Sequence, residues 1–349
     1  KGKEIKLGLF ALAMAAIVTA PVKNTYAAVS ENTAVYGVQT QADDGTTSGT
    51  CGADEDGANA TWKLDENGVL TISGTGAIKE YAFSRSSLSI KKVVIKEEIT
   101  EIGSKAFQNC EQIQTVTLPE SLTTLEEGTF FGCSGLKKIT IPKNCVTIGE
   151  DAFYCCSGLE EISVEDGNPV FDSRGNCKAL IDSKSNTLLL GGKNSVVPDG
   201  VTAIAEYAFA YTGITEITIP DSVIRIDECA FYTCTQLKSV VLPKNVTSIE
   251  NDVFRYCSNL ENVKLPEGLK TIGAGAFSGC SSLQTVTIPA AVDAIGLTAF
   301  YACKSLTEIV IPKGVTKISN RCFYECDNLT SIVLPGSIEA IDVYAFREC

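Results

Sequence analysis

The stretch from Cys257 to Gly279, CSNLENVKLPEGLKTIGAGAFSG, decides the fold because the chain repeats its pattern many times. The spacing LxxVxL places alternate side chains on one face of a short strand. Proline is tolerated after that strand, where a backbone donor is no longer needed. The later LxxI and Ala-Phe positions turn the chain back and add a small and a large side chain to an interior. The apolar positions are Leu260, Val263, Leu265, Leu269, Ile272, Ala276 and Phe277.

Phenylalanines mark the repeat along the rest of the chain. The period is about 23 residues, a length typical of solenoid repeats. The phenylalanines stand at positions 107, 130, 153, 209, 231, 254, 277, 300, 323 and 346, so the step to 209 is long and the step to 231 is slightly short. About six large apolar side chains in one unit do not offset the conformational entropy of ordering the whole unit. One unit should therefore not fold alone, and the sequence predicts stacked units that share their apolar faces.

The long step between Phe153 and Phe209 predicts an insertion. The pattern stops after CSGLEEISV, which ends at Val164, and resumes at Val196, so residues 165–195 form an inserted hairpin island. Within it, CKALIDSKSNTLLL reads as two short strands around a DSKSN turn. Insertions in repeat proteins map to loops on one face, which is often a binding face.

The segments before the repeats predict export and a cap. Residues 1–27 have a basic start, an apolar run from Leu7 to Ala20 and the small residues of TYA, as in a signal peptide. An N-terminal anchor or a buried strand is the alternative for this apolar run, which is too short for an ordinary membrane span. Residues 28–50 are polar and predict a flexible linker. Residues 51–84 predict an N-terminal cap hairpin, and the repeats then occupy 85–349.

Composition excludes several functions. The net charge of −13 disfavours binding to nucleic acids and to anionic membranes. The chain has no histidine, which removes the His-dependent nucleophile pairs and zinc-protease motifs. We therefore expect no enzyme activity, no cofactor and no metal site.

The pattern CxxLxxIxIPxxVxxIxxxAF resembles the BspA-like, or Treponema-type, leucine-rich repeats of bacterial surface proteins. The resemblance covers about residues 85 to 349 in ten copies. It implies a mainly β leucine-rich repeat solenoid, a curved or elongated right-handed coil of short parallel strands with an N-terminal β cap. Small departures occur: Tyr211 stands in the place of the repeat cysteine in the shortened unit, and Lys96 stands in the proline place.

A cysteine occupies the first position of nine repeats. In the family this position forms a buried ladder that satisfies backbone groups of neighbouring turns, and cysteine packs there as a small apolar residue. Disulfides within the ladder and metal binding are the alternatives, although parallel side chains make the torsion of a disulfide hard to reach. Cys51 and Cys177 lie outside the pattern, and we expect them to be the most exposed. The ladder cysteines are Cys110, Cys133, Cys156, Cys234, Cys257, Cys280, Cys303, Cys326 and Cys349.

The residue after the repeat phenylalanine is aromatic in five units, which predicts a broken stripe of candidate binding residues. Exposed aromatic side chains are typical anchors of protein interfaces. The alternative is that these rings pack between coils at the turn. The five residues are Phe131, Tyr154, Tyr232, Tyr301 and Tyr324.

These features predict a noncatalytic protein-binding or adhesion module of a secreted or cell-surface bacterial protein. The expected partner is a protein of the host, the matrix or a bacterial surface, with no nucleic acid and no membrane span in the mature chain. The alternative function is a structural spacer, or the targeting arm of a larger surface protein or enzyme whose other domains lie beyond residue 349. The sequence does not indicate the oligomeric state.

Overall fold

The computed structural model describes residues 40–41, 47–86 and 88–349. The chain divides into two units, residues 1–33 and 34–349, and all described residues belong to the second unit. The predicted signal peptide and most of the predicted linker lie outside the described residues. Within the described ranges, no helix is long and apolar enough to cross a membrane.

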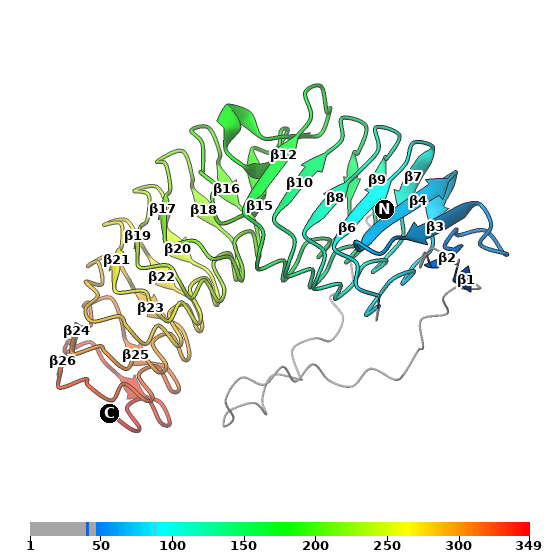
Figure 1. Cartoon of the computed structure of the whole chain (residues 1–349). Coiled ribbons are helices and arrows are strands. Elements are labelled where there is room, and N and C mark those ends of the chain that lie inside the picture. The colour runs from blue at the N-terminus through cyan, green and yellow to red at the C-terminus, as the bar shows by residue number, and fades with distance from the viewer. Residues whose placement is uncertain (1–39, 42–46, 87) are drawn as a thin grey trace, which may run out of the picture. The chain divides into compact units, whose positions relative to one another are not determined.

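Most regular coils contain two short strands, which correspond to the LxxVxL and LxxI parts of the repeat (Figure 1). In the coil that begins at Cys280 the first strand is reduced to an isolated bridge at Thr285. The first strands of successive coils pair in parallel with a step of one repeat, as in Ser239 opposite Asn262. They are β4 (Val69–Gly74), β6 (Lys92–Ile95), β8 (Thr115–Thr117), β10 (Lys138–Ile141), β12 (Glu161–Val164), β17 (Glu216–Thr218), β19 (Ser239–Val241), β21 (Asn262–Lys264), β24 (Glu308–Val310) and β26 (Ser331–Val333). The predicted solenoid of short parallel strands is therefore confirmed.

The second strands form shorter ladders on another side of each coil. They also pair in parallel with their neighbours, as in Thr271 opposite Ala294. They are β5 (Gly76–Ile78), β7 (Ile99–Ile102), β9 (Thr124–Leu125), β11 (Thr147–Ile148), β16 (Ala203–Ile204), β18 (Arg225–Ile226), β20 (Ser248–Ile249), β22 (Thr271–Ile272), β23 (Ala294–Ile295), β25 (Lys317–Ile318) and β27 (Ala340–Ile341).

The N-terminal strands are antiparallel and lead into the first coils. β1 (Thr40–Gln41), β2 (Thr47–Thr50), β3 (Ala60–Leu64) and β4 follow one another in one sheet. Residues 47–50, which were predicted to be part of the flexible linker, thus form a paired strand. Trp62 of β3 is buried, and its ring meets that of Phe83 edge to face at 5.8 Å.

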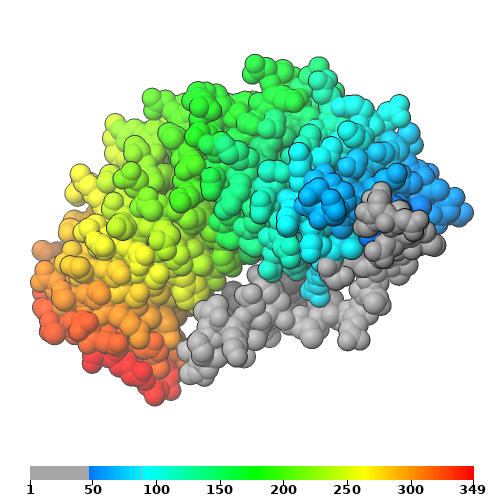
Figure 2. Space-filling view, in the orientation of Figure 1, coloured from blue at the N-terminus to red at the C-terminus, as the bar shows by residue number. Residues whose placement is uncertain are grey.

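The repeat phenylalanines form a buried column of stacked rings, which we call the phenylalanine column. Neighbouring ring centroids lie 5.2 Å apart for Phe83 and Phe107 and 5.5 Å apart for Phe254 and Phe277. Phe83 was missed in the sequence because its distance from Phe107 along the chain is slightly longer than the regular period. In the space-filling view the coloured coils abut one another in order from cyan to red (Figure 2).

Backbone hydrogen bonds connect each coil to the following one beside this column. The residue two positions before the column phenylalanine has a positive φ, such as Asp252 with φ 55°. Its N–H donates to Ala274 O at 2.8 Å, and the N–H of Phe254 donates to Ala276 O at 2.9 Å. The left-handed residue turns the chain so that alternate amides face the next coil.

The inserted island lies where the regular stacking changes. It contains β13 (Phe171–Asp172), the short 3₁₀ helix η1 (Arg174–Asn176), β14 (Ala179–Asp182) and β15 (Thr187–Gly191). β14 and β15 are antiparallel, and β15 then pairs in parallel with β16. The buried apolar residues fall into two clusters that meet at this island, one before and one after it.

Truncating the phenylalanine column should destabilise the coils around it. We expect Phe254→Ala to lower the free energy of unfolding by about 3–5 kcal/mol, because the ring is fully buried between two others. Urea unfolding followed by circular dichroism measures this loss. Thr285→Ala, at an exposed position, should change stability by less than about 0.5 kcal/mol. Similar losses for both variants would contradict the assignment.

Candidate functional site

The five predicted aromatic residues lie in the turns that follow the phenylalanine column, and all five are half-buried. The ring centroids of Phe131 and Tyr154 are 5.4 Å apart, and those of Tyr301 and Tyr324 are 5.3 Å apart. Each of these rings therefore packs against a neighbouring coil and also keeps part of its surface in solvent. The sequence allowed two interpretations of these rings, as exposed binding residues or as packing between coils. Both apply, because one part of each ring packs on a neighbouring coil and another part is exposed to solvent.

Further tyrosines join this stripe, which we call the aromatic column. Tyr211 links Tyr154 to Tyr232, with centroid distances of 5.5 and 5.6 Å, and Tyr256 continues it at 5.8 Å from Tyr232. Tyr207 meets Tyr154 edge to face at 5.0 Å. Sequence reasoning missed these rings because it considered only the position directly after each phenylalanine, whereas turn residues two positions before or after it also reach the same edge.

The placement of Tyr211 corrects one sequence assignment. Thr212, not Tyr211, takes the place of the repeat cysteine: it is buried, and its hydroxyl lies 3.5 Å from the thiol of Cys234. Counting forward from Phe209 gives Thr212, whereas counting back from the strand gives Tyr211. The shortened unit lacks one residue between Thr212 and the strand that follows it. The count from Phe209 does not cross this deletion and the count back from the strand does, so the two counts disagree.

The edges of the aromatic column carry polar and charged groups. The hydroxyl of Tyr301 donates to the Glu325 carboxylate at 3.0 Å, and burial together with this carboxylate raises the pKa of Tyr301 to about 12. Arginines cover other rings: Arg255 lies 5.0 Å from the centroid of Tyr256, and Arg347 lies 5.9 Å from that of Tyr324. The rings thus offer neutral hydroxyls and cation–π pairs at one edge of the coils.

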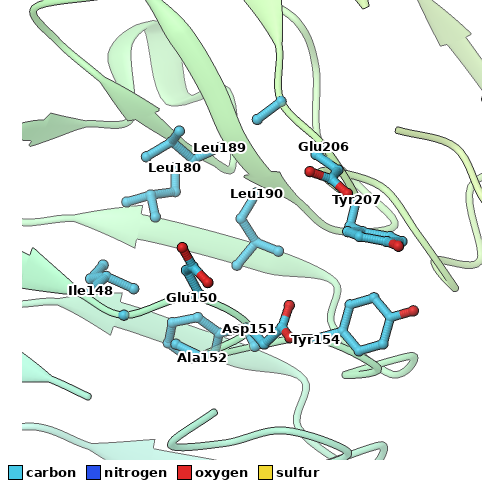
Figure 3. Close-up of a pocket in the computed structure, with 13 residues that line it drawn as sticks. Ile148, Glu150, Asp151, Ala152, Tyr154, Leu180, Leu189, Leu190, Glu206 and Tyr207 are labelled. Atoms are coloured by element: carbon cyan, nitrogen blue, oxygen red, sulfur yellow. The ribbon is translucent and has the colours of Figure 1, made fainter. Parts of the chain in front are cut away.

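A pocket of about 570 Å³ lies beside the aromatic column, between the coil that contains β11 and the island (Figure 3). Figure 3 shows Leu180, Leu189 and Leu190 on the island side and Glu150, Asp151 and Tyr154 on the facing coil. Glu206 and Tyr207 of the following coil complete the lining, together with Ile148, Gly149, Ala152, Phe153 and Ala205. Apolar side chains therefore form one wall, and three carboxylates lie around it.

The pocket is electrostatically negative. Its lining contains Glu150, Asp151 and Glu206 but no Lys or Arg. Partial burial raises the pKa of Asp151, and the charges of Glu150 and Glu127 raise it further, while the nearby Lys105, which is paired with Glu127, opposes them. Partial burial likewise raises the pKa of Glu206, with added repulsion from Glu228 and Asp151. A cation would relieve this repulsion.

The nine repeat cysteines form a second column inside the coils. Each thiol donates to the carbonyl oxygen of the phenylalanine in the preceding coil, as Cys257 does to Phe231 at 3.2 Å and Cys280 to Phe254 at 3.1 Å. Burial raises the pKa of the Cys110 and Cys326 thiols to about 12. Such thiols stay protonated and unreactive at neutral pH, which suits a structural role.

The expectation for Cys51 and Cys177 is wrong. Both are buried, because Cys51 lies under the cap strands and the thiol of Cys177 donates to Ala179 O at 3.6 Å. Cys349 is exposed and Cys155 is half-buried. All fifteen cysteines lie within the described residues, and none of them forms a disulfide bond. In the same part of the chain, no group of three or more His, Cys, Asp or Glu side chains is placed to hold a metal ion.

Comparison with known proteins agrees with the geometry. The family model described as a BspA type leucine rich repeat region matches residues 76–174, 192–306 and 224–349 in six copies. The chain belongs to this BspA type leucine rich repeat family. No curated protein matches it.

Solved structures show the same fold as this BspA type chain. A leucine-rich repeat protein from Eubacterium ventriosum is 24% identical with a TM-score of 0.61, and the match covers 86% of this chain and 95% of that one. A leucine-rich repeat protein from Bacteroides ovatus is 25% identical with a TM-score of 0.51, covering 83% and 91%. The predicted family and fold class are thereby confirmed.

Thiol labelling tests the cysteine column of this BspA type array. In native protein, iodoacetamide should modify the exposed Cys349 first and Cys155 more slowly, because burial keeps the other eight column thiols both inaccessible and protonated. Peptide mass spectrometry after timed labelling identifies the sites. In about 6 M guanidinium all fifteen should react. Fast native labelling of Cys257 or Cys280 would contradict the buried column.

The acidic pocket predicts a pH-dependent stability. Ionised Asp151 has a raised pKa, so its charge costs stability at neutral pH, and this cost disappears as the pH falls through the folded and then the unfolded pKa. Asp151→Asn should therefore raise the melting temperature near pH 7 and lose this gain near about pH 3. Asparagine also tolerates the φ of 56° at this position.

Asp221→Asn is the control of opposite sign. A hydrogen bond from Lys244 lowers the pKa of Asp221, so its ionised form contributes stability that is lost as the pH falls. This variant should not gain in melting temperature near pH 7 by differential scanning calorimetry. Equal shifts in both variants would show that the pocket repulsion is not the cause.

Proposed function

We propose that this chain is a noncatalytic protein-binding module that acts outside the cell or at its surface. The observation that carries the proposal is the aromatic column, which places partly exposed rings along one edge of the described array, in the coils from Phe131 to Tyr256 and again at Tyr301 and Tyr324. Tyrosine and tryptophan anchors dominate many protein interfaces because they bury a large area with few rotatable bonds.

Packing between coils prepares these rings for binding. One face of Tyr232 contacts Tyr211 and another contacts Tyr256, so the ring loses little further conformational freedom when a partner covers it. Less ordering on binding leaves more of the contact energy as affinity. Charged groups such as Arg255 and Glu325 lie beside the rings and can supply specificity at the rim.

Two observations support an extracellular location. Residues 1–27 have the composition of a signal peptide. Membership in the BspA type family also supports it, since the sequence resemblance is to bacterial surface proteins. Adhesion to a host, matrix or bacterial surface protein is the form of binding that we propose.

A capture experiment tests this function. The full chain, immobilised on beads, should capture a specific protein from extracellular matrix extract or from lysates of neighbouring bacteria, and the captured protein should then bind again after purification. The variant Tyr232→Leu, Tyr301→Leu, Tyr324→Leu should lose at least about tenfold in affinity, because leucine keeps part of the packing but removes the ring faces.

The control variant carries Thr140→Ala, Thr218→Ala and Thr287→Ala, three exposed residues of the first-strand face. Both variants must show the circular dichroism of the parent chain. Equal binding by the tyrosine and threonine variants would contradict the aromatic column as the binding surface. Capture of no specific partner by the parent would favour the alternative of a structural spacer or targeting arm.

A further inference from the structure

The hydrogen bonds that connect successive coils beside the phenylalanine column are interrupted at one place in the described array. In the preceding coil, Gly128 N–H donates to Glu150 O at 2.9 Å and Phe130 N–H to Ala152 O at 2.8 Å. Among the described residues, the equivalent amides of Asp151 and Phe153 have no backbone or side-chain acceptor. The pattern resumes in the coil after the island, where Phe209 N–H donates to Ala230 O at 2.8 Å.

One of the second-strand ladders also ends at this place, as others do after β18 and after β23. β11 pairs with β9 on one side and is the edge of its four-stranded sheet, while the next ladder begins with the island strands. In several regular coils the carbonyl of this strand's last apolar residue accepts a hydrogen bond from the following coil, as Ile272 O does from Gly296 N–H at 2.8 Å. Within the described part of the chain, no donor reaches the matching carbonyl of Ile148.

The island explains why the gap stays open. Gly191 of β15 donates its N–H to Ala208 O at 2.8 Å, an acceptor that the preceding coil would otherwise use. A Cβ on Gly191 would lie 2.1 Å from the Phe209 ring, so this ring covers the glycine backbone. Phe209 stacks on Phe231 at 5.2 Å, and the phenylalanine column is interrupted between Phe153 and Phe209.

The space left between the coils is the acidic pocket. Its volume of about 570 Å³ lies within the range of pockets that bury a ligand. The edge strand β11 and the amides of Asp151 and Phe153 lie along one side, and Leu180, Leu189 and Leu190 lie on the other. Unpaired strand edges bind extended peptides by main-chain hydrogen bonds, and the neighbouring pockets select the side chains.

We propose that the gap binds an extended, lysine- or arginine-bearing segment of a protein partner, which adds as a parallel strand to β11. This inference rests on the proposed protein-binding function and deepens it. Carbonyls of the segment accept from Asp151 and Phe153, and one of its amides donates to Ile148 O. An apolar side chain packs on the island leucines.

Charge complementarity selects the basic partner. Glu150, Asp151 and Glu206 surround the opening, and the lining provides no cation. A lysine or arginine of the segment brings its charge to these carboxylates while its methylene stem covers apolar wall. An acidic segment with the same backbone would instead add repulsion.

The array itself supplies a probe. Residues 314–321, GVTKISNR, form the corresponding part of a later coil, where Lys317 lies in β25 and Asn320 O accepts from Thr298 N–H at 3.0 Å. A fluorescein-labelled peptide GVTKIGNRA has the required carbonyls and two positively charged side chains. Glycine replaces the serine because in the array the Ser319 hydroxyl donates to Ile295 O at 2.7 Å, whereas Gly296 at the same repeat position donates its N–H. We expect the full chain to bind it by fluorescence anisotropy, with weaker binding as salt increases.

Two altered peptides separate the backbone contribution from the charge contribution. Methylation of the glycine amide nitrogen that corresponds to Gly296 removes a strand donor and keeps every charge, and it should abolish binding at the concentrations used for the parent peptide. Replacing lysine and arginine by glutamate should also abolish it. If the N-methylated peptide binds as tightly as the parent, strand addition is wrong; if the acidic peptide binds as tightly, charge selection is wrong.

Protein variants locate the site. Glu150→Gln with Glu206→Gln should weaken peptide binding by about three- to tenfold, while Glu261→Gln with Glu308→Gln, two exposed acids on the first-strand face, should leave it unchanged. Hydrogen exchange should slow at Asp151 and Phe153 when the peptide binds. Absence of peptide binding, or slowing only elsewhere, would overturn the proposal.

The tyrosine-to-leucine variant distinguishes this inference from the proposed function. Its changes lie outside the pocket lining, so it should bind the peptide normally even if it loses a captured partner. If a captured partner binds equally well to the parent and to the Glu150→Gln, Glu206→Gln variant, the proposed protein-binding function stands, but the pocket is not the binding site.

Discussion

The fold depends on the contact that each repeat makes with the next repeat around its phenylalanine. The amide of Phe107 donates to Thr129 O at 2.9 Å, and its carbonyl accepts from the thiol of Cys133 at 3.2 Å. Both partners come from the following coil. A buried backbone group without a partner costs about 1–3 kcal/mol, so a coil is stable only when its neighbour is in place.

The other regular features follow from this dependence. The rings of successive phenylalanines stack because the backbone bonds hold the coils in register. Cysteine suits its position because the thiol is small enough for the crowded interior and still donates to a carbonyl. The tyrosines of the turns gain their fixed orientation from the same register, since each projects from a coil whose position the column determines.

The periodicity was sufficient to predict this part of the structure. The regular spacing of the phenylalanines indicated which positions share a column, so the strands, the phenylalanines and the cysteines could be assigned without coordinates. The assignment failed where the spacing changes. Phe83 precedes Phe107 by slightly more than the regular period, and the shortened unit gave Tyr211 the place that Thr212 occupies.

Two other features depend on contacts that no spacing encodes. Cys51 and Cys177 lie outside the repeat, and their burial depends on how the cap and the island pack. The pocket likewise arises from three-dimensional placement, because the island separates the coils at β11 while Tyr154 and Tyr211 still meet at the other end. The sequence indicated where the insertion lies but not that it leaves amides without acceptors.

The interruption at the island implies that the array consists of two cooperative parts, one on each side. The hydrogen bonds beside the phenylalanine column, the column itself and the buried core are divided there, and only the first-strand side keeps bonds such as that from Lys193 N–H to Leu159 O. Native-state hydrogen exchange in increasing urea, on the parent chain and on Phe107→Ala and Phe254→Ala, tests this claim most directly. With two cooperative parts, Phe107→Ala should speed exchange mainly at residues 83–153 and Phe254→Ala mainly at residues 209–323. Equal acceleration throughout the array by both substitutions would show one cooperative unit and would contradict the account.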